Sequence, residues 1–316
     1  MIKWLQDSYN GLYKILLEPV TPKRKMVAAL VIGVLLGLLW AYVLQPVIFY
    51  DADPVSLHQS WQDEWVKLLS DRNAAANADV RFGTQHPDKD LKQNTIGTFN
   101  VLEAMRAQGV KKIAFSSTSS VYGEAKVIPT PEDCPMPVQT SLYAASKLAG
   151  EGLITSYCEG FGYQSWIFRF VSILGARYTH GHVFDFVRKL LADPTTLHIL
   201  GNGKQTKSYM DVTDLLSSII TAVERGQEKV NIFNLGTGEA CTVNQSVGWI
   251  CERLGVSPKL TYAGGERGWI GDNPVIQLDP ARIRALGWAP KYEIREGVER
   301  TVDWLKANTW ALEQRH

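Results

Sequence analysis

The longest apolar segment of the chain lies near its amino terminus. No charged side chain occurs between Met26 and Tyr50, and residues 26–44 are nearly all aliphatic. As a helix that rises about 1.5 Å per residue, this core would span roughly 28 Å, close to the hydrocarbon thickness of a bilayer. The pattern therefore predicts a single transmembrane helix over residues 26–49. The alternatives are a buried core helix, or the strand and helix that begin a nucleotide-binding fold.

The flanks of this segment predict how it would be oriented. Three basic residues at 23–25 precede it, whereas Asp51 and Asp53 follow it. Because basic flanks stay on the cytoplasmic side of a membrane, we expect a single-pass protein with a cytoplasmic amino terminus. Residues 1–25 carry a helical apolar stripe, typical of an amphipathic segment on a membrane surface. Residues 50–74 are predicted to form a helical stalk.

Beyond residue 75 the pattern of apolar positions becomes that of an α/β domain. Short apolar runs predict buried strands at 111–115 and 164–170. Helical periodicity predicts one helix that Asn94 opens and Gly109 stops, and another from Ser141 to about Gly160. Since strands and helices alternate, we expect this part of the chain to be α/β.

Composition excludes some functions and leaves others open. The chain has 33 Lys and Arg residues against 32 Asp and Glu, a formal net charge of +1, so nothing indicates nucleic-acid binding. Its four cysteines show neither the spacing of metal ligands nor a dense disulfide framework. We therefore predict free thiols and no metal site.

The strongest chemical signal is a tyrosine and a lysine four residues apart, Tyr143 and Lys147. On a helix both side chains lie on one face. A tyrosine hydroxyl is a poor base at neutral pH, and a neighbouring ammonium favours its phenolate and lowers its pKa. Thr118, at the end of the preceding strand, can hold a substrate oxygen. A Tyr-x-x-x-Lys pair also arises by chance in a chain with 12 tyrosines, so the order of the surrounding motifs carries more weight.

That order resembles a known family. Phe115-Ser116-Ser117-Thr118, then Val121-Tyr122-Gly123, then Tyr143-x-x-x-Lys147, is similar to the extended short-chain dehydrogenases, the NAD-dependent epimerase/dehydratase group that includes UDP-glucose 4-epimerase. The resemblance runs from about residue 75 to 308, and residues 1–74 do not match it. It implies a nucleotide sugar as substrate, NAD as cofactor, a cytoplasmic location for this domain and a homodimer as a candidate assembly.

The resemblance also implies roles for individual residues. Tyr143 would take a proton from a sugar hydroxyl, Lys147 would hold the nicotinamide ribose, and Thr118 would bind the sugar oxygen. A small substrate lobe is expected mainly from residues 172–195 and 238–308. The implied cofactor-binding residues are Tyr143, Lys147, Asn94, Ala75, Ala76 and Ser116, and the substrate-binding ones are Thr118, Ser172, Arg267 and Asp272. Ser172 stands where the family usually has asparagine.

One part of the family pattern is missing from the sequence. The glycine-rich turn that receives the pyrophosphate, Gly-x-x-Gly-x-x-Gly after a first strand, is not found. The resemblance therefore implies an α/β fold with a truncated Rossmann-like doubly wound parallel sheet, which would have an unpaired edge and follow the transmembrane helix.

Two functional interpretations follow. The first is an NAD-dependent UDP-sugar 4-epimerase, an isomerase; epimerisation is favoured over dehydration because Thr118-Ser119-Ser120 carries no carboxylate. The alternative is an inactive membrane-anchored chimera, or an interaction module that retains half of an epimerase fold.

Overall fold

The structure is a computed structural model, and it describes residues 47–50, 83, 86–135, 138–268 and 273–313. The predicted amphipathic segment, most of the predicted membrane helix and the predicted stalk therefore lie outside the described residues. So do three predicted site residues, Ala75, Ala76 and Asp272. In the part that is described, no helix has the length and apolar character that crossing a membrane requires.

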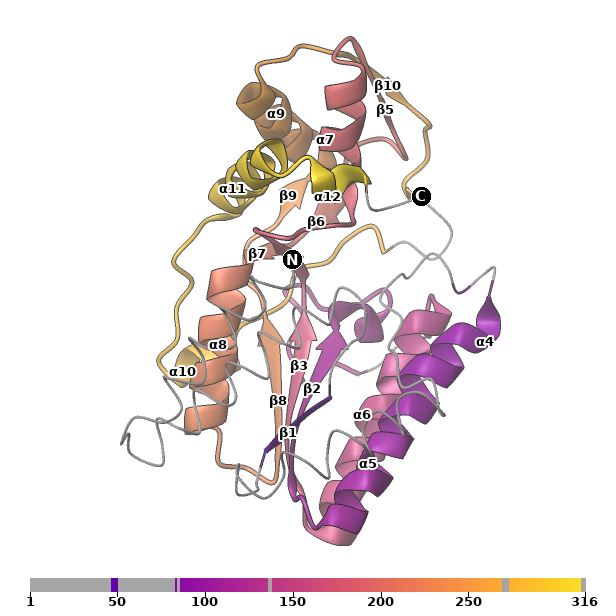
Figure 1. The fold of residues 1–316 in the computed structure, drawn as a ribbon, viewed down its shortest axis with the longest axis vertical. Helices are drawn as coiled ribbons and strands as arrows, with labels where there is room; N and C mark the ends of the chain where they lie inside the picture. Colours follow the sequence, from indigo (N-terminus) through magenta and orange to yellow (C-terminus); the bar gives the residue numbers. More distant parts are fainter. Residues whose placement is uncertain (1–46, 51–82, 84–85, 136–137, 269–272, 314–316) are drawn as a thin grey trace.

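The centre of the molecule is a four-stranded sheet in the order β1-β2-β3-β8 (Figure 1). The strands are β1 (Val47–Tyr50), β2 (Lys112–Thr118), β3 (Gln164–Phe170) and β8 (Val230–Leu235). β2, β3 and β8 are parallel, with Ile167 of β3 paired with Phe115 on one side and Ile232 on the other. The predicted buried parallel strand at 164–170 is confirmed.

Helices cover both faces of this sheet, as the α/β pattern predicts. α5 (Gly97–Gln108) and α6 (Leu142–Phe161) lie on one face, and α8 (Val212–Arg225) and α10 (Ala281–Ala285) on the other (Figure 1). Successive residues of a strand point to opposite faces. In β2, Ile113 and Phe115 join the core under α5 and α6, whereas Ala114 joins the core under α8. The arrangement is Rossmann-like.

A smaller lobe lies beyond the carboxyl ends of the parallel strands (Figure 1). It has its own apolar core, drawn largely from α7, α9 and α11. Its elements are β4 (Ser172–Leu174), α7 (His182–Ala192), β5 (Thr196–Ile199), β6 (Thr206–Lys207), β7 (Tyr209–Asp211), β9 (Cys241–Thr242), α9 (Val243–Leu254), β10 (Lys259–Tyr262), α11 (Ile294–Ala307) and α12 (Trp310–Glu313). These elements include much of the segments 172–195 and 238–308 that we expected to form a substrate lobe.

The outer edge of β2 differs from expectation. The truncated sheet was predicted to have an unpaired edge, but β1 runs antiparallel along β2, with Val47 opposite Phe115 and Tyr50 opposite Lys112. Residues 47–49 had been assigned to the end of the membrane helix, and that assignment is wrong for these three residues. The backbone N–H and C=O groups at a sheet edge need partners, and β1 supplies them.

The two helices that carry Asn94, Tyr143 and Lys147 can also be compared with their predicted bounds. The first begins not at Asn94 but at α4 (Pro87–Asp90), and it continues through a π-helical turn, η2 (Leu91–Ile96), into α5. α6 ends at Phe161, as the prediction of an end at about Gly160 requires, and Gly162 stops it by taking the left-handed conformation (φ 67°) that glycine adopts without steric cost. All four cysteines are free thiols, as predicted.

Candidate active site

The first part of the site is the carboxyl end of β2. Ser116, Ser117 and Thr118 end the strand, and η3 (Ser119–Tyr122), a short 3₁₀ helix, follows at once. The hydroxyl of Thr118 accepts a hydrogen bond from the backbone N–H of Ser120 at 3.1 Å, which caps that helix. This bond fixes the Thr118 side chain where the parallel strands end, the side of an α/β sheet on which ligands bind.

The second part is the first two turns of α6. Ser141 caps the helix as predicted, because its side chain accepts a hydrogen bond from the backbone N–H of Ala144 at 3.1 Å. Tyr143 and Lys147 follow on one face, and both side chains are buried. The Lys147 Nζ donates to the carbonyl oxygen of Ser116 at 2.9 Å and lies 4.9 Å from the centre of the Phe115 ring. The structure therefore places Lys147 against the end of β2.

Burial has a large effect on the charge of Lys147. Only 1% of this residue is exposed, and burial lowers the pKa of its ammonium to about 7, against the opposing influence of the Glu151 and Asp90 carboxylates. A buried ammonium with a pKa in this range gains or loses its proton near neutral pH. In its protonated form such a group stabilises the anionic form of a nearby phenol, and a phenolate can accept the proton of a substrate hydroxyl.

The third part is Asn94, in the π-helical turn. Its side-chain amide donates to the Ser146 hydroxyl at 2.9 Å and to the Asp90 carboxylate at 3.3 Å. Ser146 in turn donates to the backbone carbonyl of Tyr143 at 2.7 Å. Asn94 is thus joined to the backbone of the helix that carries Tyr143 and Lys147, as a site residue should be.

The predicted substrate-binding residues are less closely grouped. Ser172, in β4, is exposed. Arg267 forms an ion pair with Glu124, which comes directly after the Val121-Tyr122-Gly123 turn. Both side chains of this pair are about half exposed, so water competes with the interaction. The pair brings Arg267 next to the loop that leaves the end of η3.

Comparison with known proteins identifies the family. The model of the NAD dependent epimerase/dehydratase family matches residues 62–236, more than half of the chain. The chain belongs to this family. The match begins at residue 62, so it includes part of the segment that the sequence motifs left outside the family. The resemblance on which the motif analysis rested is confirmed.

Individual epimerases are similar over most of the chain. UDP-glucose 4-epimerase of Mycolicibacterium smegmatis is 31% identical over 266 residues, 81% of this chain and 80% of that protein. The crystal structure of Thermotoga maritima UDP-glucose 4-epimerase with UDP-glucose has a TM-score of 0.67 and 31% identity, covering 74% of this chain and 76% of that one. The Thermus thermophilus UDP-glucose 4-epimerase complex with NAD has a TM-score of 0.65 and 31% identity, covering 73% and 76%.

The described part of the site fits the cofactor of this family. An ammonium has three N–H donors, and the hydrogen bonds found for Lys147 among the described residues use one of them, on Ser116. A fully buried donor that has spare capacity favours a polar ligand at this position. Tyr143, Ser116 and Asn94 lie on the elements around it, so the residues present suit the ribose of a nicotinamide nucleotide.

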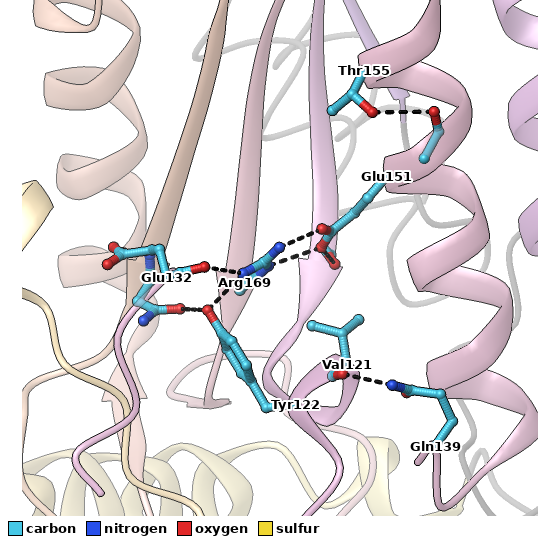
Figure 2. Close-up of polar contacts among 10 residues, drawn as sticks. Val121, Tyr122, Glu132, Gln139, Glu151, Thr155 and Arg169 are labelled. Atoms are coloured by element: carbon cyan, nitrogen blue, oxygen red, sulfur yellow. Dashed lines mark hydrogen bonds and ion pairs between the residues drawn. The ribbon is translucent and has the colours of Figure 1, made fainter. Parts of the chain in front are cut away.

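The motif analysis did not single out Glu151, a buried carboxylate next to the candidate site. It lies one turn beyond Lys147 on the same face of α6, and it is buried. Figure 2 shows it facing Arg169 of β3. The regular spacing of Tyr143, Lys147 and Glu151 was the signal that could have found it, because three polar residues on the buried face of a helix need partners.

Proposed function

We propose that this chain is an NAD-dependent 4-epimerase of a UDP-sugar. The observation that supports this most is Lys147, buried on the face of α6 that carries Tyr143 and hydrogen-bonded to the end of β2. The similarity to UDP-glucose 4-epimerases gives the substrate class. When bound, NAD would supply the hydride chemistry at the sugar carbon. Tyr143, Lys147, Asn94 and Ser116 would hold the cofactor at its nicotinamide end.

Side chains of this protein carry out the proton transfer. Tyr143 takes the proton of the sugar 4-hydroxyl and gives it back when the hydroxyl re-forms on the opposite face. The Lys147 ammonium stabilises the Tyr143 phenolate, since an opposite charge nearby lowers the pKa of a phenol. Thr118 binds the same sugar oxygen and keeps it within reach of Tyr143. Ser172 and Arg267 contribute on the side of the sugar diphosphate.

The choice of epimerisation over dehydration rests on three residues. Elimination of water needs an acid and a base at the sugar, and Thr118-Ser119-Ser120 provides no carboxylate. Incubation of the full-length protein with NAD and a panel of UDP-hexoses tests this. We expect the 4-epimer of at least one sugar, seen by chromatography or NMR. A 4-keto-6-deoxy sugar as the product would mean dehydration, and the proposal would then be wrong.

The same protein preparation distinguishes the alternative, an inactive membrane-anchored chimera or interaction module. That alternative requires no turnover and no saturable binding of NAD. Membrane attachment through residues 26–46, which lie outside the described residues, and formation of a homodimer stay predictions. For the first, we expect the expressed full-length chain to stay in the membrane fraction after alkaline carbonate washing. Release by the wash would contradict the membrane helix.

Arg267 gives a prediction about substrate affinity. Its partner Glu124 is a carboxylate in the place that a substrate phosphate would take, so it competes for the guanidinium, which binds phosphate well. We expect Glu124→Gln to tighten UDP binding roughly two- to fivefold, the range that an exposed ion pair supports. Calorimetric titration with UDP measures this. Glu252→Gln, which removes an exposed partner of Arg295 on α11, should leave UDP affinity unchanged. Weaker binding in Glu124→Gln would contradict the competition.

A further inference from the structure

The helix that carries Tyr143 and Lys147 has a third polar residue on the same buried face. Glu151 follows Lys147 by four residues, as Lys147 follows Tyr143, so the three side chains lie in one row along α6. Glu151 is 4% exposed. A carboxylate this deep in the protein is costly unless it is paired and hydrogen-bonded.

Glu151 is paired on two sides. Arg169 of β3 donates to its two carboxylate oxygens, from Nε at 3.1 Å and from Nη2 at 2.7 Å. The Ser117 hydroxyl donates to it from β2. Ser117 lies between Ser116, whose carbonyl receives the Lys147 ammonium, and Thr118. One carboxylate therefore ties α6 to the strand segment that forms the other half of the candidate active site.

Arg169 also has hydrogen-bond partners on the side away from Glu151. Its Nη1 donates to the Tyr122 hydroxyl at 2.7 Å and to the Glu132 backbone carbonyl at 3.0 Å, and its guanidinium lies 4.9 Å from the centre of the Tyr122 ring. The Tyr122 hydroxyl then donates to the Asn234 side chain at 2.8 Å, near the carboxyl end of β8. This network of hydrogen bonds joins α6 to β3, η3 and β8, next to the helix turns that carry Tyr143 and Lys147.

The stability of the fold alone does not account for this network. Buried ion pairs rarely stabilise a protein more than well-packed apolar side chains of the same size would. What the ion pair adds is a fixed geometry: a bidentate contact sets both the distance and the angle between the two groups. Here that geometry sets the position of β2 against α6, and with it the positions of Ser116 and Thr118 relative to Lys147 and Tyr143.

The charges around Lys147 give Glu151 a second effect. On α6 itself Lys147 has Tyr143 on one side and Glu151 on the other. α4 contributes Asp90, β3 contributes Arg169, η3 contributes Tyr122, and η2 contributes the neutral Asn94. Glu151 and Asp90 are the carboxylates that favour the charged form of Lys147 and raise its pKa against burial. Removal of Glu151 would leave Arg169 as an unbalanced cation near the ammonium.

We propose that Glu151, held by Arg169 and Ser117, is a positioning residue of the epimerase site: it fixes β2 against α6, and with it the place of Ser116 and Thr118 relative to Lys147 and Tyr143. This inference rests on the function proposed above. It assigns to Glu151 no contact with substrate or cofactor. Its effect is exerted through Ser117 and through the electrostatic field at Lys147.

The test is the titration of Lys147 in Glu151→Gln. NMR of the full-length protein labelled at lysine Cε follows the proton affinity of Lys147, whose resonance is assigned by its absence from Lys147→Met. We expect the affinity of Lys147 for its proton to fall about tenfold or more, one unit of pKa. Glu159→Gln is the matched control, because Glu159 lies on the same helix but is exposed and paired with Lys229. It should leave the titration unchanged.

Turnover supplies a second readout. In Glu151→Gln we expect kcat for the UDP-sugar to fall at least tenfold with KM little changed, and the alkaline limb of the pH profile to move to lower pH. A Lys147 titration like that of Glu159→Gln would overturn the proposal, as would an unchanged kcat with a raised KM. Because the NMR titration needs no turnover, an inactive wild-type chain would refute the proposed function and leave this test intact.

A second variant covers the case in which Glu151→Gln does not fold. Glu151→Gln combined with Arg169→Gln leaves no unpaired buried charge, so it should fold more readily. Since Glu151 lies one turn from Lys147 on α6 and its carboxylate raises the pKa of that ammonium, the double variant should still lower the proton affinity of Lys147, by a smaller factor. A wild-type titration in the folded double variant would overturn the proposal.

Discussion

Replacing Lys147 by methionine should abolish epimerisation and at the same time make the protein more stable. Methionine fills much of the same space, but it carries no charge to bury. Burial lowers the pKa of Lys147 to about 7 from its ordinary 10.5, so the charged ammonium destabilises the folded protein at neutral pH. Even after the loss of the hydrogen bond to Ser116, we expect a gain on the order of 2 kcal/mol in the free energy of unfolding at neutral pH.

The sign of the pH dependence follows from proton binding. Between pH 7 and 10.5 the unfolded chain keeps the Lys147 proton and the folded chain does not, so the free energy of unfolding rises with pH across this window. The cost of the buried charge is complete below pH 7 and is gone above pH 10.5. Lys147→Met should lack this contribution, and its advantage over the wild type should therefore shrink as pH rises from 7 to 10.5.

Thermal unfolding of both proteins at several pH values measures these effects. Lys229→Met is the matched control, because Lys229 is exposed and paired with Glu159 at the surface. Its stability should stay close to that of the wild type. If Lys147→Met were less stable than the wild type at pH 6, Lys147 would be a structural residue and its proposed role in the site would lose its physical basis.

Replacing Tyr143 by phenylalanine should lower kcat by roughly 10² to 10⁴, the usual contribution of a general acid–base residue. The change removes one oxygen and keeps the ring, so the folded state should lose no more than about 1.5 kcal/mol. The product formed from the UDP-sugar is quantified by chromatography. Unfolding in denaturant checks the fold.

Tyr163→Phe is a demanding control for this variant. Tyr163 is also buried, and its hydroxyl has no hydrogen-bond partner among the described residues. Removing that hydroxyl should leave both kcat and stability near the wild-type values. Equal activity of Tyr143→Phe and Tyr163→Phe would show that Tyr143 is not the residue that moves the proton.

The sequence alone predicts the parts of the site that depend on neighbours in the chain. The cap at Ser141 and the shared face of Tyr143 and Lys147 follow from helical spacing over one or two turns. The place of β2 follows from the apolar run at 111–115, but the strand continues past this predicted end through the hydroxyl residues to Thr118. These local patterns determine where the chemistry is and which residue types it uses.

The rest depends on contacts between distant segments. Glu151 and Arg169 meet because α6 returns antiparallel over the sheet to β3, and Glu124 meets Arg267 across 143 residues of chain. Neither pair has a periodic signal of its own. The π-helical turn that directs Asn94 toward Ser146 likewise has no pattern that distinguishes it from an ordinary helix start.

The strand β1 shows a different limit. Its four residues, Val47–Tyr50, are apolar or aromatic and continue a longer uncharged segment. A short apolar run suits the end of a membrane helix and a buried strand equally well. What decides between them is the open edge of β2, with backbone groups that need partners, and that edge exists only in the folded protein.

The measurement that tests the central claim most directly uses a UDP-sugar deuterated at C4 of the hexose. The full-length protein is incubated with NAD and this substrate in ordinary water, and the 4-epimer is isolated. If Tyr143 and Lys147 serve an oxidation and reduction at C4, the product keeps its deuterium at C4, and Tyr143→Phe forms little of it. A product that has exchanged its C4 deuterium for solvent hydrogen, or no product from a chain that binds NAD, would contradict the epimerase mechanism proposed for this protein.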